Sequence, residues 1–226
     1  MGCSIAIDGP AGAGKSTIAK RVAKELSFIY VDTGAMYRAV ALYLIRNHID
    51  GRDGAAVAAA CTGARVSIEY REGEQIVLLN GEDVNSLLRT EEVSLMASVT
   101  SANPKVREHL LSLQRRLARE NDVVMDGRDI GTTILPDAQV KIFLTASTET
   151  RAKRRYDEMA LKGVSCDMEE IRRDIQERDK RDMCREISPL RQADDAILVD
   201  SSALSIEEVA GRILAIYKEK VGCGCR

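Results

Sequence analysis

The chain has 226 residues, and its 33 basic and 35 acidic residues give a formal net charge of −2, which argues against a polybasic or highly acidic binding protein. Aromatic residues make up 4% of the chain and Trp is absent, which disfavours a stacking platform for single-stranded nucleic acid. At about 150 residues per domain, the length predicts one large domain or one domain with a sizeable insertion.

Short apolar runs alternate with helical stretches along the chain, a pattern typical of a parallel α/β sheet. The expected strands are 4–8, 28–31, 123–125, 140–144 and 196–199. We expect helices at 15–26, from Thr33 (as its cap) to about Asn47, and from a capping box at Ser205 to about Val221.

Two stretches depart from this alternation. Between residues 60 and 100 the apolar residues Val66, Ile68 and Tyr70 alternate with polar ones, and turn signals follow at 72–74 and 80–81, which predicts a small antiparallel unit. Residues 151–185 hold 11 basic and 9 acidic residues, so we expect a solvated helical hairpin that is able to move.

The glycine-rich segment 9–16 fits the phosphate-loop pattern G-x-x-x-x-G-K-[ST], between a strand and a helix. Backbone N–H groups and the start of the helix can bind an anion, Lys15 can reach the β- and γ-phosphates of ATP, and Ser16 can ligate Mg²⁺. The candidate nucleotide-binding residues are Gly9, Pro10, Ala11, Gly12, Ala13, Gly14, Lys15, Ser16 and Thr17. The alternative is a glycine-rich turn with a solvated lysine.

A phosphate loop alone is compatible with a switch GTPase, an ATPase motor or a small-molecule kinase. The Asn-Lys-x-Asp motif that reads guanine is absent from the sequence, and a motor ATPase is usually larger. Other parts of the chain must therefore decide between these classes.

Two segments follow expected strands at the carboxyl edge of the sheet, where α/β proteins bind ligands. The segment 32–38 offers a hydroxyl, an aromatic ring and an arginine in Thr33, Tyr37 and Arg38. In the segment 126–129, Asp126 could organise Mg²⁺ or its waters and Arg128 projects toward the same edge. The ordinary interpretations are a helix cap with packing residues, and a turn with a surface salt bridge.

A third segment lies in the charged stretch. On a helix, Arg178, Arg181, Asp182 and Arg185 would share one face. Clustered guanidinium groups repel one another unless an anion or carboxylates neutralise them, and their forked geometry suits phosphate oxygens. The ordinary interpretation is a solvated helix with internal salt bridges.

No segment is typical of a membrane span, since the longest charge-free run, 93–104, has twelve residues and a span needs about 20 apolar ones. No secretory signal or complete lipidation signal is present either. Six scattered cysteines indicate reduced thiols and a cytoplasmic protein. The closing Cys223 and Cys225 could bind a metal or oxidise, and the simpler expectation is a frayed tail.

Six motifs and the helix expected after Ala146 together resemble the bacterial cytidylate kinases, over nearly the whole chain. The motifs are Asp8–Thr17, Asp32–Arg38, Gly81–Val84, Arg89–Val93, Asp126–Thr132 and Glu177–Arg185. The resemblance implies a phosphate-loop kinase fold, a five-stranded parallel sheet flanked by helices. It implies a core of 1–59, 100–150 and 186–226, an antiparallel insert at 60–99 that binds the monophosphate, and a helical lid at 151–185. It also implies a monomer that transfers the γ-phosphoryl group of Mg-ATP to CMP or dCMP.

The resemblance carries residue roles as well. Arg38, Arg128 and Arg185 would hold the acceptor phosphate, and Arg178 and Asp182 the ribose. Ser98, Arg107 and Asp129 would read the cytosine edge, and Tyr37 would line the pocket. The implied catalytic residues are Lys15, Arg128, Arg181 and Asp126, with Arg181 stabilising charge on the transferring phosphoryl group and Asp126 holding Mg²⁺ through water. Thr33 replaces a Ser common in the family and adds a methyl group at a ribose or base contact.

Three alternatives remain open from the sequence. The nearest is another monophosphate kinase, acting on UMP or AMP. A nucleotide-sensing protein that keeps the phosphate loop for stability is more remote, because a sensor of ATP alone needs no acceptor-side arginines. Nucleic-acid binding through 151–185 is opposed by the nine acidic residues there.

Overall fold

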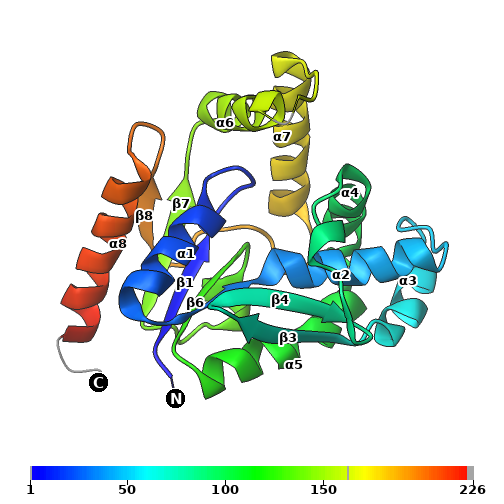
Figure 1. Ribbon diagram of the computed structural model, residues 1–226, viewed down its shortest axis with the longest axis horizontal. Helices are drawn as coiled ribbons and strands as arrows, with labels where there is room; N and C mark the ends of the chain where they lie inside the picture. Colours follow the sequence, from blue (N-terminus) through cyan, green and yellow to red (C-terminus); the bar gives the residue numbers. More distant parts are fainter. Residues whose placement is uncertain (1, 162, 223–226) are drawn as a thin grey trace. The chain divides into compact units, whose positions relative to one another are not determined.

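The computed structural model describes residues 2–161 and 163–222 (Figure 1). They form two compact units, one of residues 2 and 29–123 and the other of residues 3–28, 124–161 and 163–222. The expected tail with Cys223 and Cys225 lies outside the described residues. Within these described stretches no helix is long and apolar enough for a bilayer span.

The five-stranded parallel sheet is confirmed, with the strand order β2-β6-β1-β7-β8. Its strands are β1 Ser4–Asp8, β2 Ile29–Asp32, β6 Val123–Gly127, β7 Val140–Thr145 and β8 Ile197–Asp200. All residues of β1 and β6 are buried, which explains why these strands are continuous apolar runs rather than alternating ones.

The antiparallel sheet is also confirmed and belongs to the first unit. It consists of β3 Val66–Arg71, β4 Glu74–Leu79 and β5 Glu82–Asp83 in that order. Both of its turns have two successive residues with positive φ, Glu72 and Gly73 in one and Asn80 and Gly81 in the other. Such turns match the twist of the flanking strands, which is why Asn-Gly was a usable signal.

Helices complete each unit. The first unit contains α2 Thr33–Arg46, α3 Gly54–Ala60, η1 Cys61–Gly63, η2 Asn85–Leu87, α4 Glu91–Thr100 and α5 Pro104–Glu120. The second contains α1 Lys15–Leu26, one π-helical turn η3 Ile130–Ile134, α6 Thr148–Leu161, α7 Met168–Cys184 and α8 Ile206–Val221. The capping box at Ser205 and Glu208 is confirmed.

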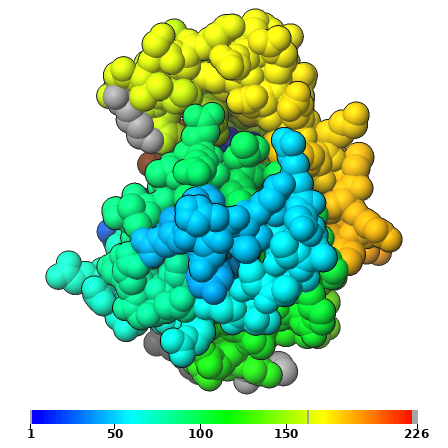
Figure 2. Space-filling view, turned by 90° about the vertical axis from the view of Figure 1, so that its right-hand side faces the viewer, coloured from blue at the N-terminus to red at the C-terminus, as the bar shows by residue number. Residues whose placement is uncertain are grey.

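The expected helical hairpin is the pair α6 and α7, which cross each other (Figure 1) and form the yellow-green and yellow surface of Figure 2. A small apolar cluster of Ala152, Ile171 and Ile175 joins the two helices. The pair therefore has its own core, although most of its surface is charged and solvated.

Three local predictions need correction. The second strand runs from Ile29 to Asp32 rather than 28–31, and the cap of α2 is Asp32, not Thr33. The carboxylate of Asp32 accepts a hydrogen bond from Ala35 N at 2.8 Å, so the capping oxygen comes one residue earlier and Thr33 begins the helix. Arg185 lies outside the helical face predicted for it, because α7 ends at Cys184 and Arg185 has an extended backbone.

The start of the phosphate loop gives a test of this packing. Gly9 has φ +151°, and a Cβ there would overlap the carbonyl oxygen of Leu144 in β7. We expect Gly9→Ala to lower the free energy of unfolding by about 3 kcal/mol, from backbone strain and the clash together. Gly73→Ala is the matched control, since its φ is +80° and nothing lies within 4 Å of the added Cβ, so about 1 kcal/mol is expected. Chemical denaturation measures both, and equal losses would contradict the prediction.

Candidate active site

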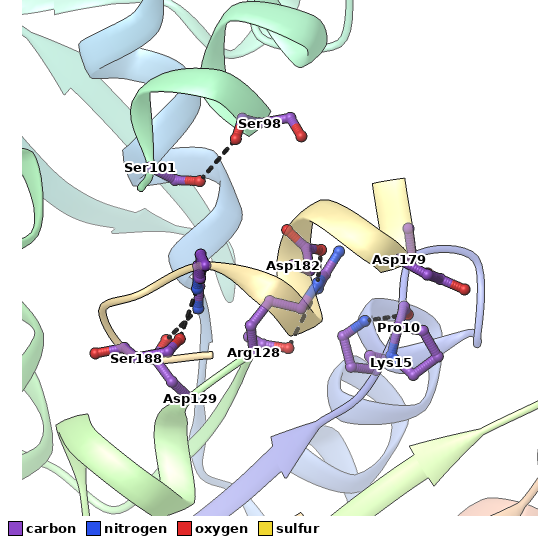
Figure 3. A network of polar contacts seen from close by, with 12 residues as sticks. Pro10, Lys15, Ser98, Ser101, Arg128, Asp129, Asp179, Asp182 and Ser188 are labelled. Atoms are coloured by element: carbon purple, nitrogen blue, oxygen red, sulfur yellow. Dashed lines mark hydrogen bonds and ion pairs between the residues drawn. The ribbon is translucent and has the colours of Figure 1, made fainter. Parts of the chain in front are cut away.

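The phosphate loop connects β1 to α1 in the second unit. Gly14, with φ 88° and ψ 9°, precedes α1, and no described side chain caps the first turn of the helix. The first N–H groups of α1 are thus oriented for an anion, as helix N-termini are in nucleotide sites. Lys15 is only 5% exposed, and its Nζ donates to the Pro10 carbonyl at 2.7 Å (Figure 3).

Lys15 lies among other cations. Burial lowers its pKa below the usual range, and the charges of Arg128 and Arg178 lower it further, against the opposing effects of Asp126 and Asp8. A buried ammonium group beside two guanidinium groups is costly without a bound anion. The cluster therefore favours a polyanionic ligand.

Ser16 and Asp126 form a candidate magnesium site. Ser16 Oγ donates to Asp126 Oδ2 at 3.0 Å, and Asp126 is buried at the end of β6. A hydroxyl and a carboxylate are hard oxygen donors of the kind Mg²⁺ prefers, and Mg²⁺ takes its remaining ligands from water and phosphate. Residues 2–161 and 163–222 hold no cluster of three or more His, Cys, Asp or Glu suited to a metal. The pair therefore fits Mg²⁺ that arrives with a nucleotide.

The segment after β6 is fixed by a carboxylate of β1. Asp8 is 4% exposed and accepts hydrogen bonds from Ile130 N at 2.8 Å and Gly131 N at 2.7 Å. Burial raises its pKa to about 6, although the two N–H groups act in the opposite direction. Asp8 thus holds the backbone directly after Asp129. Asp8 was not among the predicted site residues, although its position as a carboxylate at the end of a strand is a signal that the sequence carries.

The predicted residues of the second unit form two ion pairs. Arg128 Nε lies 2.8 Å from Asp182 Oδ2 (Figure 3). Arg185 Nη2 lies 3.6 Å from Asp129 Oδ1. Burial acts to raise the pKa of Asp182, yet the pKa is lowered, because Arg128 and the neighbouring arginines favour the carboxylate. Arg181, by contrast, is exposed on α7. The structure brings four of these residues into a network and leaves Arg181 at the surface.

Two residues that the sequence did not single out anchor the phosphate loop. Arg151 of α6 is buried, donates to the Ala11 carbonyl at 3.0 Å, and pairs with Asp179 of α7 at 2.6 Å. The hydroxyl proton of Ser201, after β8, is shared between the Ala13 carbonyl, 3.2 Å from Oγ, and the Thr145 carbonyl, 3.0 Å from Oγ. Both contacts span long stretches of sequence, and Arg151 stands among many solvated charges, so no local pattern distinguishes it.

The predicted residues of the first unit gather on α2, α4 and α5. The Arg107 guanidinium lies 5.5 Å from the centre of the Tyr37 ring and donates to the Ser101 carbonyl. Thr33 is buried. Arg38 Nε and Ser98 Oγ are buried without a hydrogen-bond partner in the part of the chain that the structure describes. Buried polar atoms of native proteins are usually satisfied, so these two point to a ligand or water.

Comparison with known proteins agrees with this chemistry. A family model described as cytidylate kinase matches residues 5–219. A cytidylate kinase of Caldicellulosiruptor bescii is 49% identical over 218 residues, 96% of each chain, and one of Bacillus velezensis is 50% identical over 217 residues, 96% of this chain and 97% of its own. An uncharacterized protein from Eubacterium ventriosum shares the fold, with a TM-score of 0.53, 13% identity, and coverage of 95% of this chain and 97% of its own.

The environment of Asp8 predicts a pH dependence of stability. Because its pKa is about 6 in the folded chain, above the usual 3.8, the folded chain binds more protons than the unfolded chain between these values. The contribution of Asp8 to the free energy of unfolding therefore falls as the pH rises through this window. Between pH about 4 and pH about 7, we expect the free energy of unfolding of the wild type to fall by about 2 to 3 kcal/mol relative to that of Asp8→Asn. A difference that stays constant in denaturation at each pH would contradict this.

Proposed function

The chain belongs to the cytidylate kinase family, and from this membership we propose that it transfers the γ-phosphoryl group of Mg-ATP to CMP or dCMP, yielding ADP and CDP or dCDP. The observation that carries the proposal is the buried Lys15 among the half-buried Arg128 and Arg178, beside the Ser16–Asp126 pair. A cluster of this kind neutralises the charge of a nucleotide polyphosphate.

ATP would bind at residues 9–17, with Lys15 on its β- and γ-phosphates. Mg²⁺ would be held by Ser16 directly and by Asp126 through water, and it would supply charge neutralisation on the phosphate oxygens. Arg151 and Ser201 support this role, because they bind carbonyl groups of the loop and so fix its backbone next to the start of α1.

For the acceptor nucleotide we propose the residue roles that the family resemblance implies. We assign its phosphate to Arg38, Arg128 and Arg185, its ribose to Arg178 and Asp182, its base to Ser98, Arg107 and Asp129, and the pocket wall to Thr33 and Tyr37. Arg38 Nε and Ser98 Oγ, which are buried without a hydrogen-bond partner among the described residues, support these roles, since each could hydrogen-bond to the ligand. Asp129, buried and negatively charged, can accept a hydrogen bond from the amino group of cytosine.

The reaction would need no covalent intermediate and no general base, because the attacking group is already a phosphate oxyanion. Catalysis would come from alignment and from neutralisation of the added charge by Lys15 and the arginines. Arg181, exposed on α7, would stabilise the transferring phosphoryl group once the lid at 151–185 closes and excludes water. The core, insert and lid boundaries remain predictions, as do a monomeric state and a cytoplasmic location.

A substrate panel tests the acceptor. Purified protein with Mg-ATP is given CMP, dCMP, UMP or AMP, and ADP formation is followed. We expect kcat/KM for CMP or dCMP to exceed the values for UMP and AMP by at least about tenfold, because unpaired buried polar groups penalise the wrong base. Equal rates on all four would rule out cytosine reading. ATP binding without monophosphate-dependent ADP formation would indicate a sensor.

Lys15→Ala tests the phosphoryl-transfer role. Removing this charge should lower kcat by at least about a hundredfold in steady-state kinetics, because it neutralises charge that grows in the transition state. Lys24→Ala is the matched control, since Lys24 is exposed in the last turn of the same helix and should leave kcat unchanged. A loss below about tenfold, equivalent to ~1.4 kcal/mol, in a folded variant would show that Lys15 is misassigned.

A further inference from the structure

Two side chains of the β3–β4 hairpin bind the backbone of β2. Strand β2 stands at one end of the sheet order, and such a strand has backbone groups that no neighbouring strand pairs. Tyr70 Oη donates to the Tyr30 carbonyl at 3.0 Å. Gln75 makes a double contact, with Oε1 accepting from Asp32 N at 2.8 Å and Nε2 donating to Asp32 O at 3.3 Å. The Gln75 amide thus takes the place of a strand residue opposite Asp32.

Asp32 is bound at four polar atoms. Gln75 engages its N–H and its carbonyl, while the side-chain Oδ1 accepts from Ala35 N at 2.8 Å and Oδ2 accepts from Arg38 Nη2 at 3.0 Å. The residue is 9% exposed. With the backbone fixed on both sides of its Cα, only the short side chain of Asp32 can adjust. The direction in which its carboxylate presents Oδ2 to Arg38 therefore depends on Gln75.

The fit between Asp32 and Arg38 is close. A Cβ on Gly34 would lie 3.1 Å from Arg38 Nη1 and 3.1 Å from Asp32 Oδ1, so there is little spare space beside the ion pair. Arg38 Nε is buried without a hydrogen-bond partner among residues 2–161 and 163–222. One edge of the guanidinium is thus held by Asp32, and Nε is left for another acceptor.

We propose that Gln75 is a positioning residue for Arg38, acting through the backbone and carboxylate of Asp32. The inference rests on the proposed function, in which Arg38 binds the phosphate of the acceptor. A guanidinium that is oriented before the ligand arrives loses less conformational freedom on binding. The effect of Gln75 should therefore appear in the KM for CMP, while kcat and the KM for ATP stay near their wild-type values.

The test compares Gln75→Met with Tyr70→Phe. Gln75→Met keeps the length of the side chain and removes both hydrogen bonds to Asp32. Tyr70→Phe removes one hydrogen bond from the same hairpin to the same strand, two residues away from Asp32. We expect Gln75→Met to raise the KM for CMP about fivefold, the effect of losing one well-placed hydrogen bond, and Tyr70→Phe to change it less than about twofold. Thermal melting establishes that both variants fold.

A double-mutant cycle separates positioning from general stability. If Gln75 acts through Arg38, Gln75→Met should add less than about twofold to the KM for CMP in an Arg38→Met background. The inference would be overturned if Gln75→Met raised the KM for CMP by the full fivefold in the Arg38→Met background as well. It would also be overturned if Gln75→Met and Tyr70→Phe had equal KM values for CMP. Gln75→Leu, which also removes both hydrogen bonds to Asp32, should give the same rise and serves if Gln75→Met does not fold.

The wild-type assay keeps the two proposals apart. If wild type forms no ADP in response to CMP or dCMP, the proposed function fails before any variant is considered. If wild type is active and the Gln75→Met KM is unchanged, the inference about Gln75 fails and the proposed function stands.

Discussion

Holding the buried Lys15 close to the half-buried Arg128 and Arg178 is the physical constraint on which the second unit depends. Lys15 is almost fully buried, and Arg128 and Arg178 lower its pKa instead of supporting its charge. Nearby carboxylates offset part of the repulsion, chiefly Asp126 and Asp182. Buried charges cost free energy even when paired, so the arrangement is costly for folding and becomes favourable when a polyanion binds.

The same constraint explains how the phosphate loop is held. A loop that offers its N–H groups to phosphate needs partners for its carbonyl groups elsewhere. Arg151 and Ser201 supply them from α6 and from the segment after β8, while the Lys15 ammonium takes the Pro10 carbonyl. Because Arg151 also pairs with Asp179, the loop is tied to the charged helix pair through one buried guanidinium. Motion of α6 and α7 would therefore be transmitted to the phosphate loop through Arg151.

Much of the fold followed from local patterns. Apolar runs and the phosphate-loop motif located the five strands and α1, and alternation with turn signals located the antiparallel sheet, because these features depend on neighbours in sequence. The errors arose where a tertiary contact, or a different local contact, determines where a helix begins or ends. Asp32 caps α2 in place of Thr33, and Arg185 falls just beyond the end of α7. Arg151 and Gln75 were missed because their partners are distant backbone groups, which leave no periodic signal.

Asp8 in the second unit and Gln75 in the first each fix a backbone segment at or next to a carboxylate residue. Each is a short polar side chain that binds two backbone groups of a distant segment, Ile130 and Gly131 in one case and both polar groups of Asp32 in the other. In each case the fixed backbone carries a carboxylate that faces an arginine, Asp129 with Arg185 and Asp32 with Arg38. Flexible arginines can be selective for a phosphate only if something restricts their orientation beforehand. Asp32 and Asp129 provide that restriction, because the backbone at or next to each carboxylate is fixed by Gln75 or by Asp8.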